Sequence, residues 1–209
     1  MGSLLLAILA GLIVIGLGWY LLYPELSTTA ETSSSDSAEN TNSVPPAASE
    51  SPAPQREEMV MPSDPTLYLT VPRLGLYGHT VRNDSSERAL GLGAIKLPQT
   101  DFPWQKGDTN TYIACHRLGY PGTQSYNQCL NLPAIQKGDE IDLTDTMGRI
   151  YRYQVSEILQ VAPTDIWVTK PVEGRDIVSL QTCIERPGDL WTLGPNWTER
   201  FIVRADRVS

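Results

Sequence analysis

A cysteine, a histidine and an arginine in this sequence have the types and the placement that acyl transfer requires. Cys183 ends the apolar run DIVSLQTC and His116 ends the run NTYIACH, each where a strand-like segment passes into a polar loop, a common place for functional side chains. Arg200 lies in the last apolar run, ERFIVRADRV. In such a set a thiolate attacks a carbonyl carbon, an imidazole moves the proton, and a guanidinium stabilises the oxyanion of the tetrahedral intermediate.

These residue types also have ordinary structural interpretations. A cysteine at the end of an apolar strand is more often a buried thiol than a nucleophile. Arg200 and Arg204 share one face of a strand at a period of two, while Phe201 and Val203 take the other, and we expect Arg204 to be a solvated strand residue. His79 lies within LYGHTVR and is expected to be a plain strand residue. The sequence holds no HExxH, GxSxG or phosphate-loop motif that would favour other chemistry.

The elements that would position these residues are short strands. TLYLTVP alternates with a period of two, and turns containing Gly or Pro separate it from similar runs further along the chain. No segment keeps a helical period, although 87–95 and 128–136 have room for a helical turn or two. Seven or eight short strands favour a closed barrel or a sandwich. The strand-like runs are 66–72, 75–82, 110–116, 139–145, 149–161, 176–183 and 199–208.

The beginning of the chain differs from the rest in composition. Leu4 to Leu22 is an uncharged run of nineteen residues, enough for a helix to cross the ~30 Å hydrocarbon core of a bilayer. A cleaved signal peptide is the alternative, but the run lacks a basic start and exceeds the roughly 7–15 apolar residues of such peptides. We therefore expect a membrane anchor over 1–25, a disordered Ser/Thr/Pro/Glu-rich stalk over 26–65, and a folded domain over 66–209.

Charge and cysteine content exclude several classes of function. The 209 residues carry a formal charge of −8, of which −7 lies in 1–65, so the expected domain is nearly neutral. Without a block of Lys and Arg, nucleic-acid binding has no electrostatic basis. Three cysteines and no CxxC pair exclude a disulfide-dense miniprotein and a zinc ribbon.

The order of the candidate residues along the chain resembles that of the sortases. SLQTC (179–183) matches the family's TLxTC signature, with Ser replacing the first Thr. His116 precedes it, at the start of a loop containing Gly and Tyr, and Arg200 follows it in RFIVRA. The similarity covers essentially all of 66–209, including the stretches LTVPRLGLY, LPQTDFPWQKGDTN and LNLPAIQKGDEIDL.

The resemblance implies a fold, an activity and a set of roles. The fold is a mostly-β, closed eight-stranded barrel with a few short helical turns. The activity is that of a membrane-anchored cysteine transpeptidase, which cleaves an LPxTG-like C-terminal sorting signal between Thr and Gly through a thioester. It then passes the acyl group to an amine of a cell-wall precursor or a pilin lysine. Carried over by position, Cys183 is the nucleophile, His116 the general acid/base and Arg200 the oxyanion and substrate stabiliser, with Thr182 and Tyr120 expected to bind substrate.

The resemblance also sets expectations for partners and location. The partners would be proteins bearing a sorting signal and the amine acceptor, and the domain would lie on the extracellular side of a bacterial membrane. Tyr120, four residues after His116, resembles a Tyr of the actinobacterial class E sortases, which favour LAxTG signals. Some sortases bind calcium, but 117–138 contains no Asp or Glu, the ligands that calcium needs. We therefore expect no metal and no other cofactor.

Other families fit less well. Papain-like and NlpC-type hydrolases place the cysteine before the histidine, whereas here His116 precedes Cys183 by 67 residues. The L,D-transpeptidases carry an SHGC-type motif, which is absent. The rival from a different class is a non-catalytic, membrane-tethered β-barrel that binds a peptide. Labelling of Cys183 by a peptide-like electrophile would distinguish the two.

The remaining cysteines leave two possibilities open. Cys115 adjoins His116 on a strand, so its side chain is expected to point to the opposite face. An external location permits disulfides, and a bridge from Cys115 to Cys129 would clamp the loop that carries Tyr120. Such a bridge would stabilise the chain by roughly 3 kcal/mol in the loop-entropy model. Two separate buried thiols are the alternative.

Overall fold

The computed structural model describes residues 60–209 of the chain. The expected membrane anchor and all but the end of the expected stalk lie outside the described residues. Within residues 60–209, no helix combines the length and the apolar character needed to span a bilayer.

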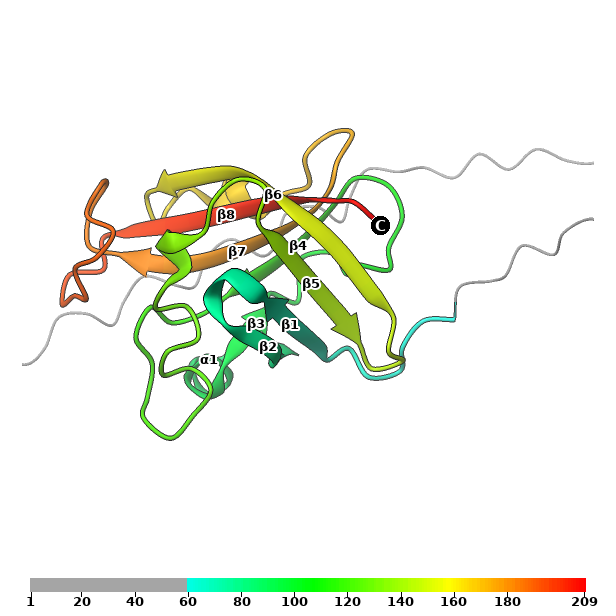
Figure 1. Cartoon of the computed structure of the whole chain (residues 1–209), viewed down its shortest axis with the longest axis horizontal. Coiled ribbons are helices and arrows are strands. Elements are labelled where there is room, and N and C mark those ends of the chain that lie inside the picture. Colours follow the sequence, from blue (N-terminus) through cyan, green and yellow to red (C-terminus); the bar gives the residue numbers. More distant parts are fainter. Residues whose placement is uncertain (1–59) are drawn as a thin grey trace, which may run out of the picture. The chain divides into compact units, whose positions relative to one another are not determined.

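The described domain is a closed β-barrel of eight strands, in the order β1-β2-β3-β4-β7-β8-β6-β5 (Figure 1). This confirms the mostly-β barrel expected from the sequence. The pairs β2–β3 and β4–β7 are parallel and the other neighbouring pairs are antiparallel. The strands are β1 (Leu67–Val71), β2 (Leu76–Asn83), β3 (Ala94–Lys96), β4 (Thr109–Ala114), β5 (Glu140–Asp145), β6 (Ile150–Val161), β7 (Asp176–Ile184) and β8 (Glu199–Arg207).

Alternation along the strands builds the core. In β5, Ile141 and Leu143 are fully buried while their neighbours are partly or fully exposed, as a period of two requires. In β8, Phe201, Val203 and Ala205 face the same apolar interior. β3 has three residues, all buried, so it carries no alternation that would reveal it in the sequence.

The helical content is small and lies in the connections. α1 (Glu87–Leu92) begins at Ser86, whose side chain accepts a hydrogen bond from the Ala89 backbone, a common N-cap. Three 3₁₀ helices are η1 (Pro72–Leu74), η2 (Leu132–Ala134) and η3 (Ile166–Thr169). α1 and η2 occupy the two places where the sequence left room for helical turns.

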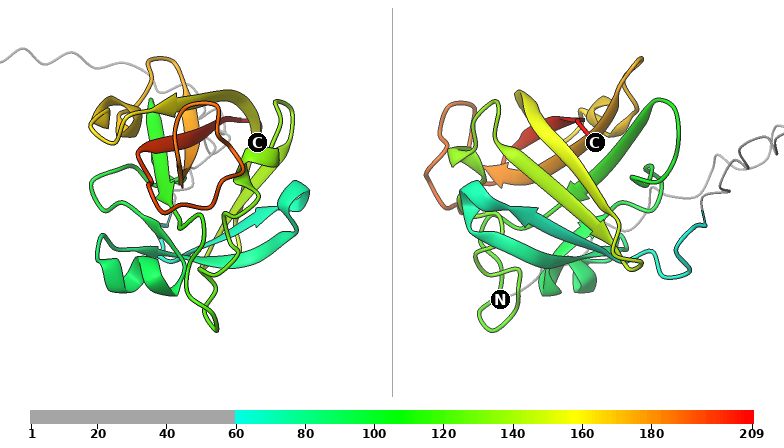
Figure 2. Two further views of the ribbon diagram at one scale, coloured as in Figure 1. Left: turned by 90° about the vertical axis from the view of Figure 1, so that its left-hand side faces the viewer. Right: turned by 45° about the vertical axis from the view of Figure 1, so that its right-hand side comes forward.

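Two long loops lie at one end of the barrel. Figures 1 and 2 show the loop between β7 and β8 (185–198) and the segment that follows β4 (115–131) at the same end of the domain. The parallel pairing of β4 with β7 explains this arrangement, because both strands run in the same direction and end together.

Candidate active site

The thiol of Cys183 faces outward at the end of β7. Its neighbours Thr182 and Ile184 are buried in the barrel, so Cys183, on the other face of the strand, is partly exposed. Cys183 is the free cysteine of the chain, since the other two are joined to each other. A partly exposed thiol at a strand end is accessible to a substrate and at the same time held by a rigid sheet.

The β7–β8 pairing places Arg200 beside this thiol. The antiparallel register sets Cys183 directly opposite Arg200, and directly opposite side chains project from the same face of a sheet. One guanidinium nitrogen, Nη1, donates to the backbone oxygens of Trp197 at 3.3 Å and Glu199 at 3.1 Å. Within residues 60–209 the other guanidinium nitrogens of Arg200 make no hydrogen bond, so they are free to donate to a substrate oxygen.

The β4–β7 pairing brings His116 to the same place. The parallel register runs from Thr109 opposite Asp176 to Ala114 opposite Gln181. It continues one step further, because the Cys115 backbone N–H donates to the Gln181 oxygen at 3.0 Å. His116, the next residue, therefore comes level with the end of β7, where Cys183 lies. Register thus places Cys183 on β7, Arg200 on β8 and His116, two residues after β4, at the same end of the barrel.

The surroundings of His116 orient its ring. The ring of Tyr120 packs edge-to-face against it, with ring centroids 5.7 Å apart. Its Nε2 atom is buried and has no hydrogen-bond partner among residues 60–209. An imidazole nitrogen without a hydrogen-bond partner is available to exchange a proton.

Burial and charge act in opposite directions on the thiol. Burial raises the pKa of Cys183, and the nearby Arg200 guanidinium lowers it without cancelling the effect of burial. Because the net shift is upward, the neutral thiol predominates near pH 7 in the free protein. The proton must then leave as the sulfur attacks, which requires a base at hand.

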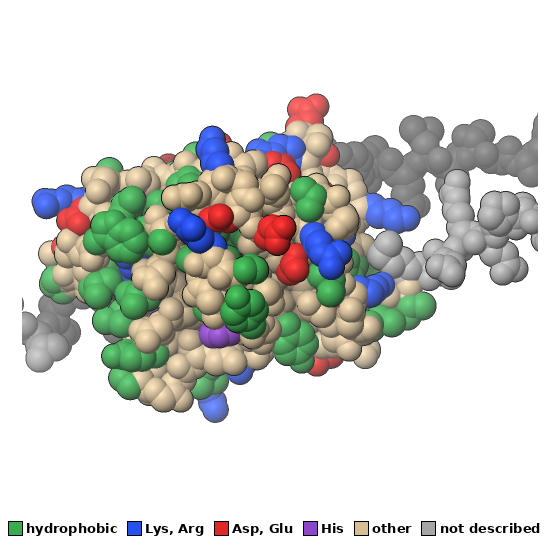
Figure 3. All heavy atoms as spheres, in the orientation of Figure 1, with side chains coloured by type: hydrophobic (Ala, Val, Ile, Leu, Met, Phe, Trp, Pro, Cys, Tyr) green, Lys and Arg blue, Asp and Glu red, His purple; other side chains and the backbone are tan. Residues whose placement is uncertain are grey.

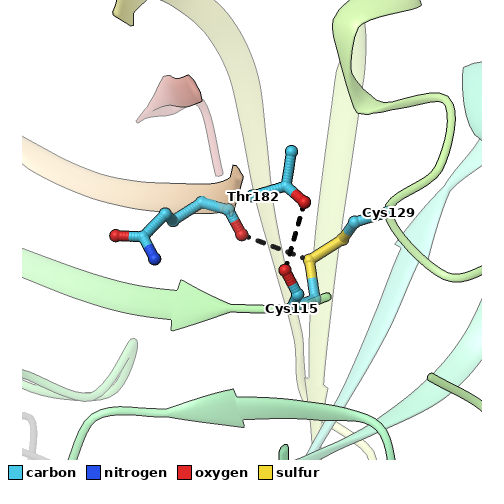
Figure 4. Close-up of a disulfide and its surroundings, with 4 residues drawn as sticks. Cys115, Cys129 and Thr182 are labelled. Carbon is cyan, nitrogen blue, oxygen red and sulfur yellow. Dashed lines mark hydrogen bonds between the residues drawn. A yellow bond between two sulfur atoms is a disulfide. The ribbon is translucent and has the colours of Figure 1, made fainter. Parts of the chain in front are cut away.

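A disulfide lies next to His116 in the sequence (Figure 4). Cys115 and Cys129 are bridged, with their Cα atoms 6.0 Å apart, within the usual range for such a bond. Cys115 is buried in the barrel core while the adjacent His116 is only partly buried, as expected for neighbours on opposite faces. Of the two possibilities that the sequence left open, the structure has the bridge.

Thr182 does not fit the expected substrate contact. Its side chain is fully buried, and its hydroxyl donates to the Cys115 backbone oxygen at 3.1 Å (Figure 4). It is adjacent to Cys183 in a strand and so lies on the opposite face. Thr182 therefore ties β7 to the residue that precedes His116, and it reaches the site only through that backbone.

The expectation that Arg204 is solvated was wrong. Arg204 is buried and pairs with Glu157 on β6 at 3.1 Å, and its guanidinium lies 5.3 Å from the centroid of the Trp167 ring. The cause is η3 and the connection around it, which cover the outer face of β8 at this point. The apolar cluster beneath them joins Val168 of this connection to Ile202 of β8 and Tyr112 of β4.

Two further residues that line this face were not found in the sequence. The Tyr112 hydroxyl donates to Oε1 of Gln181 at 2.7 Å, which fixes the Gln181 side chain on the strand that carries Cys183. Burial raises the pKa of Tyr112, so its hydroxyl remains a donor at all ordinary pH values. The alternation of side chains along a strand could have found them: Tyr112 lies four residues before His116 and Gln181 two residues before Cys183, so each shares a strand face with its partner.

The rim of the site is apolar. Exposed large hydrophobic residues lie in both loops at this end: Leu118, Tyr120, Tyr126, Trp191 and Leu193. In Figure 3 hydrophobic side chains gather toward the left side of the view, where Figure 1 shows the β7–β8 loop, while most charged side chains lie over the middle and the opposite end. Among residues 60–209 no group of three or more His, Cys, Asp or Glu side chains is arranged to hold a metal ion.

Comparison with known families agrees with this geometry. A model of the sortase domain matches residues 69–208. The chain belongs to the sortase family. Sortases are cysteine transpeptidases, so the enzyme class inferred from the order of His116, Cys183 and Arg200 is confirmed.

Solved sortase structures share the fold. Sortase C-1 from Actinomyces oris superposes with a TM-score of 0.58 at 24% identity, over 70% of this chain and 74% of that chain. The pilus-related sortase C of Group B Streptococcus gives 0.58 at 26% identity, over 71% and 70%. A lid mutant of sortase A from Corynebacterium diphtheriae gives 0.57 at 22% identity, over 69% and 70%. No curated protein sequence matches the chain.

Proposed function

We propose that this sortase cleaves an LPxTG- or LAxTG-like sorting signal between Thr and Gly and transfers the new carboxyl end to an amine. Cys183 is the nucleophile, His116 the general acid/base and Arg200 the oxyanion stabiliser. The observation that carries the proposal is the strand register: β4, β7 and β8 bring these three residues to one end of the barrel in a domain of the sortase family.

The chemistry follows from the state of the free thiol. As the Cys183 sulfur attacks the Thr carbonyl carbon, His116 takes the thiol proton and Arg200 donates hydrogen bonds to the oxyanion. The carbon–nitrogen bond to Gly then breaks, and His116 gives the proton to the leaving amine. An acceptor amine attacks the thioester and loses its proton to His116. The sulfur departs, and the proton on His116 restores the neutral thiol.

The acceptor is an amine of a cell-wall precursor or a pilin lysine, and the protein is held on the outer side of a bacterial membrane by residues 1–25. The uncharged run from Leu4 to Leu22 supports the anchor. The Cys115–Cys129 bridge supports an oxidising, external location. Membrane fractionation of the full chain against a variant lacking 1–25 tests the anchor, since only the full chain should sediment with membranes.

A transpeptidation assay over a library of sorting-signal peptides tests the activity. The protein is incubated with the peptides and an amine acceptor, and ligated products are identified by mass spectrometry. We expect products joined through the Thr carbonyl, and none from Cys183→Ala. A folded protein that binds the peptides without forming any product would contradict the proposal and favour the non-catalytic binding module.

A further inference from the structure

We propose that Arg117 is a positioning residue that clamps the tip of the β7–β8 loop (190–193) against the segment carrying His116, and so fixes one wall of the active site. Arg117 directly follows His116, and its Nη2 atom donates to the Leu190 backbone oxygen at 2.5 Å. Its guanidinium also lies 5.6 Å from the centroid of the Trp191 ring. The inference rests on the proposed function for its effect on catalysis.

The burial of Arg117 is unusual for its position. Its residue exposure is 2%, whereas the next residue, Leu118, is 41% exposed. Nε and Nη1 of Arg117 have no hydrogen-bond partner, and no acidic side chain pairs with it among residues 60–209. A guanidinium buried without a counter-ion costs free energy, so the fold does not gain from Arg117 as an ion pair. What it does supply is the link to the loop.

The tip of the β7–β8 loop has few other attachments. The base of the loop is held by Glu185, whose carboxylate accepts from the backbone and the side chain of Asn196. Leu190 is partly buried against the barrel core, whereas 191–193 are exposed, with Trp191 at 60%. Among residues 60–209, the hydrogen bond from Arg117 is the one side-chain hydrogen bond that reaches the tip from outside the loop. Without it, the tip would be held by the base of the loop, by the hydrogen bond from the Gly188 backbone to Gln160 and by the packing of Leu190 on the core.

The other end of the clamp is rigid. The disulfide fixes Cys115, two residues before Arg117, to Cys129. Two residues after Arg117, Gly119 packs so closely on Ser125 that a Cβ at this position would overlap the Ser125 backbone. The Gly119 backbone N–H also donates to the Tyr126 oxygen at 3.2 Å. Arg117 therefore links a fixed segment to the tip of a loop whose residues 191–193 are exposed.

Hydrogen exchange and kinetics of matched variants test the clamp. Arg117→Met keeps an unbranched side chain of about the length of the arginine stem and removes the donors, and Arg117→Lys keeps a charge and a donor. Arg186→Met is the control, because Arg186 lies in the same loop, has a 75% exposed side chain and, among residues 60–209, pairs only with Asp189. Trp191→Phe weakens the stacking alone.

We expect Arg117→Met to speed amide exchange at the tip and to lower kcat/KM about 10–100-fold, the factor that corresponds to losing a hydrogen bond to a charged donor. A larger share of the loss should fall on KM, because the wall positions the substrate. Arg117→Lys should restore part of the protection, and Arg186→Met should match the wild type. Arg117→Met and Trp191→Phe should be non-additive, because they act on one contact.

Exchange at the tip that is unchanged in Arg117→Met, or equally fast in Arg186→Met, would overturn the proposal. If Arg117→Met fails to fold, as judged by circular dichroism, Trp191→Phe and Arg117→Lys decide the matter by the same readout. Exchange does not depend on activity. If the wild type forms no product while exchange responds as expected, the proposed function fails and the clamp stands.

Discussion

Replacing Arg200 by Met, with Arg204→Met as the matched control, separates a role in chemistry from a role in folding. Both arginines lie on the same face of β8, four residues apart. Arg200 stands opposite Cys183 and keeps guanidinium donors free, whereas Arg204 stands opposite Ser179 and is buried against Glu157 and Trp167. The two substitutions should therefore impair different properties.

The magnitudes follow from these contacts. If Arg200 donates to the oxyanion, Arg200→Met should lower kcat by about 10²–10³-fold, the usual loss for one such donor. It should also shift thiol labelling to higher pH, because Arg200 lowers the pKa of Cys183 and its removal leaves burial unopposed. Arg204→Met should lower the unfolding free energy by about 1–2 kcal/mol. This is the low end for a hydrogen-bonded charged pair, because Glu157 is partly exposed and also lies 3.7 Å from Arg175.

The assay combines turnover of a signal peptide, alkylation of Cys183 against pH and urea unfolding for each variant. Turnover should fall for Arg200→Met with little change in the unfolding midpoint, and the reverse should hold for Arg204→Met. Equal losses of turnover in the two variants, measured well below their melting temperatures, would refute the assignment of the oxyanion role to Arg200.

Three further predictions concern the scaffold. Denatured, unreduced protein should show one titratable thiol because Cys115 and Cys129 are bridged, and three would contradict the bridge. Burial lowers the pKa of Lys96 to about 8. Between pH 8 and the ordinary lysine pKa, the unfolded chain holds a proton at Lys96 that the folded chain has lost, so the stability of the wild type should rise with pH. The urea midpoints of Lys96→Met should lack this rise. Burial alone would raise the pKa of Asp145, but hydrogen bonds from Tyr151, Arg149 and Met147 hold it below its usual range. Asp145→Asn should therefore destabilise at neutral pH by about 1–3 kcal/mol, and the difference from wild type should shrink as acid protonates the wild-type carboxylate, which urea midpoints at falling pH would show.

The strands that could be predicted from the sequence are those with one face in the core. β5 shows the alternation directly, and β8 contains a run of three apolar residues; the bounds of both agree with the predicted runs to within one residue. β3 was missed because three buried residues carry no period. The predicted strand ending at His116 stops at Ala114, since the chain leaves the sheet there to enter the disulfide-bridged segment.

The strand ends near which Cys183, His116 and Arg200 lie could be predicted from the sequence, but what surrounds these residues could not. The alternation of side chains along β8 places Arg200 and Arg204 on one face of the strand. It does not tell what covers that face, and the connection containing η3 buries Arg204. Thr182 has a hydroxyl that could contact a substrate, but it is adjacent to Cys183 in the strand, so its side chain points into the barrel. The contact between Arg117 and Leu190 joins residues 73 positions apart, and no local pattern reports it.

Intact mass spectrometry of the protein after reaction with a sorting-signal peptide tests the central claim most directly. The sample is quenched in acid without an acceptor amine, and the modified residue is located by peptide mapping. The account predicts an adduct equal to the signal fragment ending at Thr, on Cys183 alone, lost on adding hydroxylamine and absent from Cys183→Ala. An adduct on another residue, or turnover that persists in Cys183→Ala, would contradict it.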